Sequence, residues 1–383
     1  MLALGAAEIM LRIAVPPSHG YSTLPPGAQW TLIPEPAVLH GLDGVSHVRV
    51  NRFGVRGRAF GDERSEYRIL AVGGSTTLCR ALDDAEVWTH LLEVDLGHTV
   101  DGRQVWVGNV GRDGSSARDH VLQLKYLLPQ YPHMDVVVAL AGVNDMMPTI
   151  YQGWHYRLPA AVTEPAAERE EMSRAFALFP ARLQDRDPSS AGHVPWYKAT
   201  ALWQLARRAK QGLGRRRTIR MGFAGQSPLI DARRERVTAT KIDSLPSLDA
   251  PMMEYRRNLN AMADLASAAG VRLVLVTQPS AWREGMSEVE EHQLWLGLVA
   301  TGPGAPPAYM TTRVLGRAMA RYNNTMLEVC RERQLDCVDA ANLIPHDTTA
   351  MYDDVHFNEQ GSRLLARALA EHFRKRPPFL RPT

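Results

Sequence analysis

The chain has 383 residues, 45% of them hydrophobic, which is enough to bury the core of one large domain or two small ones. Its 44 Lys and Arg residues against 41 Asp and Glu residues leave a formal net charge of +3. This balance gives no basis for a nucleic-acid partner, and the composition is that of a soluble globular protein.

Residues 1–15 are apolar but short, and Glu8 and Arg12 interrupt them, so they form neither a full membrane span nor a good signal peptide. Two interpretations stay open: an amphipathic helix ended by two prolines, or the remnant of a membrane anchor. The segment that follows, residues 16–66, is predicted to be an extended arm over the surface, because its first part is rich in Pro, Gly and Ser and has no sustained period.

Five short aliphatic runs bounded by turn residues are predicted to be buried strands. They cover residues 68–72, 104–110, 135–140, 271–277 and 336–340. Helical patterns alternate with them at 83–96, 115–128, 252–269, 312–333 and 359–376. The alternation predicts an α/β fold in which a parallel sheet carries helices on both faces and the chemistry lies at the carboxyl ends of the strands.

Two of these helices have capping signals. Asp83 and Glu86 have capping-box spacing at the start of the first helix, and Asn358 is a candidate N-cap for the last one. We therefore expect the first helix to begin at Asp83 and the last to begin just after Asn358.

Between about residues 147 and 251 the alternation stops, which predicts an insertion that covers the active edge of the sheet. Within it, residues 206–220 carry seven basic residues and no acidic one. This segment is either a solvated basic face or a contact for anionic lipid or acidic polysaccharide. Trp196 and Trp203 lie close enough in sequence to join either a lid core or a sugar-stacking surface.

Ser75 follows the first predicted strand directly, in the stretch Gly73-Gly74-Ser75-Thr76. Its side chain should lie at the carboxyl edge of the sheet, near the free N–H groups of the next helix, where a nucleophile would be exposed. An isolated stretch of this kind is more often a turn and a cap. Neither of the glycine-rich phosphate-loop patterns fits it.

A serine hydroxyl is a weak nucleophile until a base takes its proton, so this interpretation needs a histidine held by a third group. His356 lies after the last strand and just before the last helix, and Asp353 comes three residues earlier. On a turn, that carboxylate can fold back to Nδ1–H while Nε2 points at the serine. Asp354 stays open as the alternative carboxylate, and a plain helix-capping role for either aspartate stays open too.

Acyl transfer also needs hydrogen-bond donors aimed at the developing oxyanion. Gly114 follows the second strand and can present its backbone N–H without a side chain in the way. Asn144 follows the third strand and offers its side-chain amide at the same edge. Taken singly, each is a common structural feature of turns.

Together these stretches resemble the SGNH hydrolase family, also called GDSL esterases and lipases. The matching stretches are AVGGSTT, NVGRDGSS, LAGVND and DDVHFNEQG, which occur here in the order of the family. The resemblance implies a three-layer α/β/α fold similar to flavodoxin, spanning residues 67–376 apart from the insertion. It implies Ser75 as the nucleophile and Asp353 and His356 as the rest of the triad. Gly114 and Asn144 would join the Ser75 N–H in the oxyanion hole.

The chain departs from the family's usual G-D-S-L, because Gly74 replaces the aspartate and Thr76 the leucine. That aspartate is not in the triad, so the chemistry should survive, while the pocket shape and the substrate class stay open. Residues 50–57, VNRFGVRG, resemble a segment found ahead of the serine block in bacterial cell-envelope members. This favours a membrane-anchored, extracytoplasmic location, with a cytoplasmic one as the alternative.

The sequence thus predicts a serine esterase that hydrolyses an acyl ester, acetyl being one candidate, on a carbohydrate, lipid or small molecule. An O-acyltransferase acting on a cell-envelope polysaccharide would use the same residues, and a non-catalytic carbohydrate-binding protein is the alternative outside enzymes. Gln278 and Trp282, in the loop after the fourth strand, are expected to line the substrate pocket, although Trp282 could equally pack against the insertion. Membrane proximity would come through the N-terminus or the basic segment.

The three cysteines are too few for a disulfide framework and lack the paired spacing of a zinc site. We interpret Cys79, Cys330 and Cys337 as small packing residues. A Cys330 to Cys337 bridge stays open if the protein works in an oxidising compartment. No set of His, Cys, Asp or Glu residues has metal-ligand spacing, and serine chemistry requires neither a metal nor a cofactor.

Overall fold

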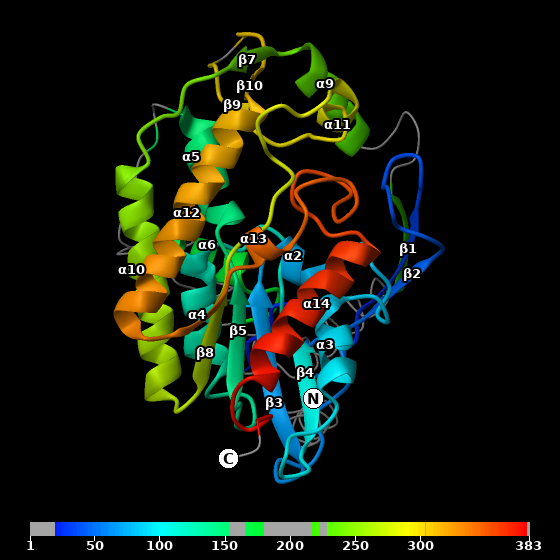
Figure 1. Ribbon diagram of the computed structural model, residues 1–383, viewed down its shortest axis with the longest axis vertical. Coiled ribbons are helices and arrows are strands. Elements are labelled where there is room, and N and C mark those ends of the chain that lie inside the picture. Colours follow the sequence, from blue (N-terminus) through cyan, green and yellow to red (C-terminus); the bar gives the residue numbers. More distant parts are fainter. Residues whose placement is uncertain are drawn as a thin grey trace, which may run out of the picture.

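The computed structural model describes residues 20–153, 156, 165–179, 216–221, 228–302 and 304–380. In this part of the chain the largest sheet has five parallel strands in the order β11-β8-β5-β3-β4 (Figure 1). Their bounds are β3 Glu66–Gly73, β4 Gln104–Asn109, β5 Val136–Leu140, β8 Arg272–Val276 and β11 Asp336–Val338. The central strands β3 and β5 are buried along their whole length, because helices cover both faces of the sheet.

Helices form the outer two layers of this fold (Figure 1). On one face α3 (Trp88–Leu96) packs against α14 (Glu359–Arg374), and on the other α10 (Asp249–Ala268) packs against α4 (Ala117–Leu127) and α12 (Thr312–Arg333). The predicted α/β/α architecture, flavodoxin-like with helices on both faces of a parallel sheet, is therefore the observed one.

Most of the predicted boundaries agree with the structure, and the start of α3 does not. The Asn358 side chain accepts from Gly361 N and caps α14 as expected. By contrast, α3 begins at Trp88 and not at Asp83. The Asp83 carboxylate accepts from the backbone N–H groups of His47 and Ala85, so it stabilises a turn before the helix.

The N-terminal segment contains more regular structure than the predicted extended arm. Strand β1 (Gln29–Pro34) pairs antiparallel with β2 (Ser46–Arg49) and parallel with β6 (Arg216–Met221). Further along, Arg56 forms a bridge with Asn109 at the end of β4. This segment therefore contacts the edge of the central sheet as well as a strand from the predicted insertion.

Several short elements lie beyond the carboxyl ends of the central strands (Figure 1). They include the small sheet β7-β10-β9, made of Thr240–Ile242, Ala308–Met310 and Leu298–Val299, with α9 (Pro228–Thr238) and α11 (Glu288–Glu291). The elements α2 (Ser75–Leu78), α5 (Val143–Gln152), α6 (Pro165–Ala175) and α13 (Ala340–Leu343) complete the described helices. Cover over the active edge therefore comes partly from the predicted insertion and partly from the segment after β8.

A disulfide joins Cys330, near the end of α12, to Cys337 in β11, with the two Cα atoms 6.3 Å apart. The bridge is the alternative that the sequence left open, in place of two free packing residues. Cys79 is free and buried, as a packing residue would be.

Candidate active site

Ser75 begins the short helix that follows the central strand β3. The strand ends at Gly73, Gly74 is the N-cap of α2, and Ser75 is its first residue. Ser75 is partly exposed, whereas the other three residues of α2 are buried. The hydroxyl therefore stands at the carboxyl edge of the sheet, within reach of solvent.

The loop between α13 and α14 brings His356 to this hydroxyl. His356 Nε2 lies 2.8 Å from Ser75 Oγ, although the two residues are 281 positions apart. On the other side of the ring, Nδ1 lies 2.9 Å and 2.8 Å from the two carboxylate oxygens of Asp353. The backbone N–H groups of Val355 and His356 both donate to Asp353 Oδ1, which folds the carboxylate back onto the ring. Hydroxyl, imidazole and carboxylate stand in series, the arrangement that lets a histidine act as a base towards a serine.

Asp354 faces the other side of the loop. Its Oδ1 accepts from Trp282 Nε1 at 2.7 Å, and its Oδ2 accepts from the backbone N–H of Trp295 at 2.8 Å. The side chain is fully buried, and burial together with repulsion from Asp353 raises its pKa. Of the two candidate carboxylates, the structure therefore puts Asp353 beside the imidazole.

Burial and charge oppose each other at the His356–Asp353 pair. Burial favours the neutral form of Asp353, but the attraction of His356 and hydrogen bonds from the loop outweigh it, so the pKa of this carboxyl is lowered. Burial also favours neutral His356, but the nearby Asp353 outweighs it, with smaller help from Asp113 and Asp354, so the pKa of the imidazole is raised. The ring is therefore mostly neutral, and available as a base, only at a pH above its raised pKa.

Asn144 comes from the next strand end and reaches the backbone beside Ser75. It is the second residue of α5, and its Nδ2 donates to Ser115 O at 2.9 Å. A Cβ built on Gly74 would lie 2.3 Å from the same nitrogen, so the amide packs directly against the residue before the serine. Because an amide nitrogen carries two hydrogens, the bond to Ser115 uses one of them.

This contact gives a physical reason for the glycine that replaces the family's aspartate. A side chain at Gly74 would have to displace the end of the Asn144 side chain. In this chain the space next to the serine is occupied by Asn144.

Gly114 lies in the loop after β4, exposed and with a φ of +75°, in the region that favours glycine. The loop is attached to the end of β3, because Arg112 N donates to Gly73 O at 3.0 Å. The structure thus brings the loop that carries Gly114 to the strand end that precedes Ser75.

Gln278 and Trp282 do not line an open pocket, contrary to our expectation, because they are 1% and 2% exposed. Gln278 Oε1 accepts from Thr76 Oγ1 at 3.2 Å, and Trp282 Nε1 is bound to Asp354. The polar end of Gln278 therefore binds α2, and that of Trp282 binds the loop between α13 and α14, which carries Asp353 and His356 and is called the acid–base loop below. The two side chains support these segments from the protein side, and the partner of Trp282 lies in the acid–base loop rather than in the predicted insertion.

Trp295 is a site residue that sequence reasoning missed. Its indole Nε1 donates to Asp353 Oδ2 at 3.0 Å, while its backbone N–H binds Asp354, so one residue holds both carboxylates. It lies between α11 and β9, in a stretch with no recognisable motif. Tyr352 is a second such residue, because its ring stacks on the imidazole of His356 with centroids 5.6 Å apart and planes at 9°.

Several predictions concern residues outside the described part of the chain. These are the membrane-anchor remnant at 1–15, Trp196 and Trp203, and residues 206–215 of the basic segment. Among the described residues, no helix combines the length and apolar character that crossing a membrane requires. Within the same residues, no three His, Cys, Asp or Glu side chains are grouped so as to hold a metal ion.

Residues 59–364 match the GDSL-like Lipase/Acylhydrolase family. The match covers most of the chain, and the three-layer fold agrees with it, so the chain belongs to this family. It is an SGNH-type hydrolase, in general terms an acyl esterase.

Solved structures with a similar fold include a catalytic mutant of Axe2, an acetylxylan esterase from Geobacillus stearothermophilus. It shares 14% identity, with 82% of this chain and 95% of that chain covered and a TM-score of 0.41. A member of the lipolytic protein G-D-S-L family from Veillonella parvula shares 12% identity, covers 81% of this chain and 100% of its own, and has a TM-score of 0.39. No curated protein matches the chain.

Proposed function

We propose that the protein is a serine esterase that hydrolyses an acyl ester on a carbohydrate, lipid or small-molecule substrate. Ser75 is the nucleophile, His356 is the general base and acid, and Asp353 is the carboxylate that orients the imidazole and stabilises its protonated form. The observation that carries the proposal is the unbroken contact from Asp353 through His356 to the partly exposed Ser75 hydroxyl, with 2.8 Å between Nε2 and Oγ.

In the acylation half, neutral His356 takes the proton of Ser75 as Oγ attacks the acyl carbonyl carbon. The carbonyl π electrons move onto oxygen and form a tetrahedral intermediate. When it collapses, the C–O bond to the alcohol breaks, and the leaving alkoxide takes the proton from His356 Nε2. The products are the free alcohol and an acyl ester on Ser75.

The negative charge of the tetrahedral intermediate needs hydrogen-bond donors that are already in place. The donors in this proposal are the backbone N–H groups of Ser75 and Gly114 and the side-chain amide of Asn144. Support comes from the contact of Asn144 Nδ2 with Gly74 and from the attachment of the Gly114 loop to the end of β3. One such donor typically contributes about 2.7 to 4 kcal/mol to the transition state.

In the deacylation half, water takes the place of the alcohol. His356 removes its proton as the water oxygen attacks the acyl carbon, and collapse releases the carboxylic acid and returns the proton to Ser75 Oγ. A sugar hydroxyl in the place of water would make the same residues an O-acyltransferase.

The test is an ester series on the purified full chain: p-nitrophenyl acetate, butyrate and octanoate, followed by acetylated oligosaccharides. Alcohol and acid release are measured together, with and without a non-acetylated oligosaccharide as acceptor. Release of alcohol and acid in equal amounts supports hydrolysis. Alcohol released in excess of acid, with the acyl group recovered on the acceptor, would support transfer, and no turnover of any ester would contradict the proposal.

A further inference from the structure

The helix that carries Ser75 is too short to satisfy its own backbone. α2 has four residues, and the last carbonyl groups of a helix lack intrahelical partners. The chain then turns at Cys79, whose φ of 47° lies in the left-handed region that non-glycine residues seldom adopt. Such a conformation persists only where surrounding contacts fix it. The position of Ser75 therefore depends on groups outside the helix.

Arg56 supplies several of those contacts from the protein interior. Its Nη1 donates to Leu78 O at 2.5 Å and to Cys79 O at 2.9 Å, and its Nη2 donates to Leu82 O at 2.7 Å. Although charged, Arg56 is only 2% exposed. Its Nε donates to Asp84 Oδ1 at 2.9 Å, so a carboxylate balances the buried charge. One side chain thus holds the whole turn after the nucleophile helix.

Arg56 is itself attached to the central sheet. Its backbone N–H donates to Asn109 O at 2.9 Å, and Asn109 N donates back to Arg56 O at 3.1 Å. The Asn109 side chain also binds α2, because its Nδ2 donates to Thr77 O at 2.6 Å. The edge strand β4, Arg56 and α2 therefore form one connected unit.

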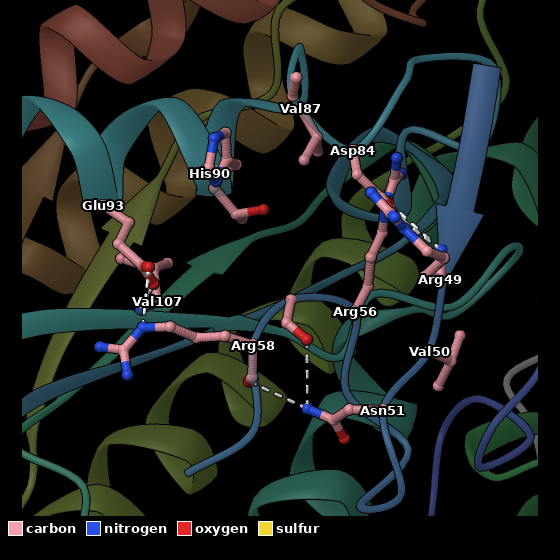
Figure 2. A pocket seen from close by; sticks show the side chains of 13 residues that line it. Arg49, Val50, Asn51, Arg56, Arg58, Asp84, Val87, His90, Glu93 and Val107 are labelled. Atoms are coloured by element: carbon pink, nitrogen blue, oxygen red, sulfur yellow. Dashed lines mark hydrogen bonds and ion pairs between the residues drawn. The ribbon is translucent and has the colours of Figure 1, made fainter. Parts of the chain in front are cut away.

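Arg49 provides a natural comparison, because it binds the same carboxylate and, among the described residues, donates no hydrogen bond to α2. Its Nε donates to Asp84 Oδ2 at 2.9 Å, and its side chain is 69% exposed. Figure 2 shows Arg49 and Arg56 directed towards Asp84 from neighbouring backbone segments, in the wall of a cavity of about 490 Å³. The two arginines differ in burial and in their contacts with the helix.

A guanidinium group suits this role and an ammonium group does not. Arginine presents five N–H donors in a planar fork, so a single side chain can reach three carbonyls and a carboxylate in different directions. Lysine concentrates its three donors on one nitrogen and cannot span the same set.

We propose that Arg56 is a positioning residue for the reaction: it fixes the end of α2 so that Ser75 Oγ stays in line with His356 Nε2. The inference rests on the proposed function, since a positioning role presupposes that Ser75 is the nucleophile. Arg56 touches neither Ser75 nor His356 in the structure. Its loss should therefore lower the rate of attack by Ser75 and leave substrate binding almost unchanged, because a small misplacement of a reacting group is costly.

The experiment compares Arg56→Lys with Arg49→Lys in the full chain. The two readouts are the rate at which a fluorophosphonate labels Ser75 and the separate kcat and KM for p-nitrophenyl acetate, well below the Tm of each variant. We expect Arg56→Lys to lower the labelling rate and kcat by about 10- to 100-fold while KM changes less than about threefold. Arg49→Lys should stay within about twofold of the wild type in both readouts.

A folded Arg56→Lys protein that is labelled at the wild-type rate would overturn the inference, as would a loss confined to KM. If Arg56→Lys does not fold, Asp84→Asn replaces it, because it keeps the guanidinium and removes its counter-charge. A loss of labelling rate in Asp84→Asn, smaller than the loss expected for Arg56→Lys, supports the inference, and an unchanged rate overturns it. A wild-type protein that is not labelled at all would instead contradict the proposed function, so the two failures can be told apart.

Discussion

Ser75 and His356 lie 2.8 Å apart, yet the segments that carry them are held in different ways. Helix α2 is held through its backbone, because Arg56, Asn109 and Trp88 all donate to carbonyl groups in or just after it. The acid–base loop, residues 344–358, is held by its backbone too, because Arg233 Nη2 donates to Tyr352 O and Ala281 N donates to Asp354 O. Unlike α2, it is also held through its two carboxylates, which accept from indole and backbone N–H groups around them.

The difference follows from the two side chains. Serine has a single side-chain torsion before its hydroxyl, so fixing the backbone comes close to fixing the nucleophile. Histidine is longer and must also change charge during the reaction, so it needs a partner that fixes both the ring and its protonation. We therefore expect substitutions around α2 to act on geometry and substitutions around the loop to act on charge.

The largest effect within this comparison should separate the two adjacent carboxylates. Asp353→Asn removes the charge beside His356 and should lower kcat by about 10⁴-fold, since an amide at that position also favours the wrong tautomer. Asp354→Asn should leave kcat per folded molecule within about tenfold and instead destabilise the protein by about 1 to 3 kcal/mol, because it places an N–H group against buried donors. Steady-state kinetics and thermal unfolding of both variants test this. A larger kinetic loss in Asp354→Asn would show that Asp354, and not Asp353, belongs to the triad.

On the nucleophile side, Asn144→Ala should lower kcat by about 100- to 1000-fold if its amide donates to the oxyanion. The matched change, Ser115→Ala, retains the backbone carbonyl that Asn144 binds and should have a much smaller effect. Turnover of p-nitrophenyl acetate by both variants measures the difference. A loss below about threefold in Asn144→Ala would remove it from the oxyanion hole.

A smaller effect should distinguish the two tryptophans behind the loop. Trp295→Phe removes the indole donor to Asp353 and should lower kcat by up to about tenfold, because a hydrogen bond to a charged group is lost. Trp282→Phe removes a donor to Asp354 alone, so its cost should appear in stability and hardly in kcat. Equal kinetic losses in the two variants would show that both act through general packing.

The smallest effect is a shift of the pH profile. The raised pKa of His356 means that the ring is protonated, and inactive as a base, up to a pH above its ordinary value of 6.5. The rate should therefore rise with pH through a midpoint above 6.5. In Asp353→Asn, burial still lowers the pKa of the ring while the main group that raises it is lost and only the smaller effects of Asp113 and Asp354 remain, so the residual activity should show a lower midpoint. A variant midpoint above that of the wild type would contradict this electrostatic account.

The sequence predicted the frame of the fold and the chemistry-bearing residues because both leave local signals. Buried parallel strands appear in the sequence as short aliphatic runs. In a parallel sheet the residues that follow these strands all lie at the same edge, so they come close together. Ser75, His356 and Asn144 can therefore be predicted as neighbours without any knowledge of their distances. Asn358 was found as a cap for the same reason, because its signal is local.

Other features could not be predicted because they depend on partners far along the chain. Arg56 lies in the stretch 50–57 that stands out in the sequence, and Trp295 lies outside any motif, but in both cases the partners are tens of positions away and leave no local signal. The start of α3 differs from the prediction because the Asp83 carboxylate accepts from His47 N, which lies 36 positions earlier in the chain. Gln278 follows a strand end as expected, but its Oε1 accepts from Thr76 and its Nε2 donates to Pro279 O, so its side chain is not free to face a pocket.

The role of Ser75 is tested most directly by locating the nucleophile chemically. The full chain is treated with a fluorophosphonate, in which the attacking oxygen displaces fluoride from phosphorus, and the modified peptide is sequenced by mass spectrometry. We expect a single adduct on Ser75, formed faster as the pH rises through the pKa of His356, and no adduct in Ser75→Ala. An adduct on another residue, or equal labelling of Ser75→Ala, would contradict it.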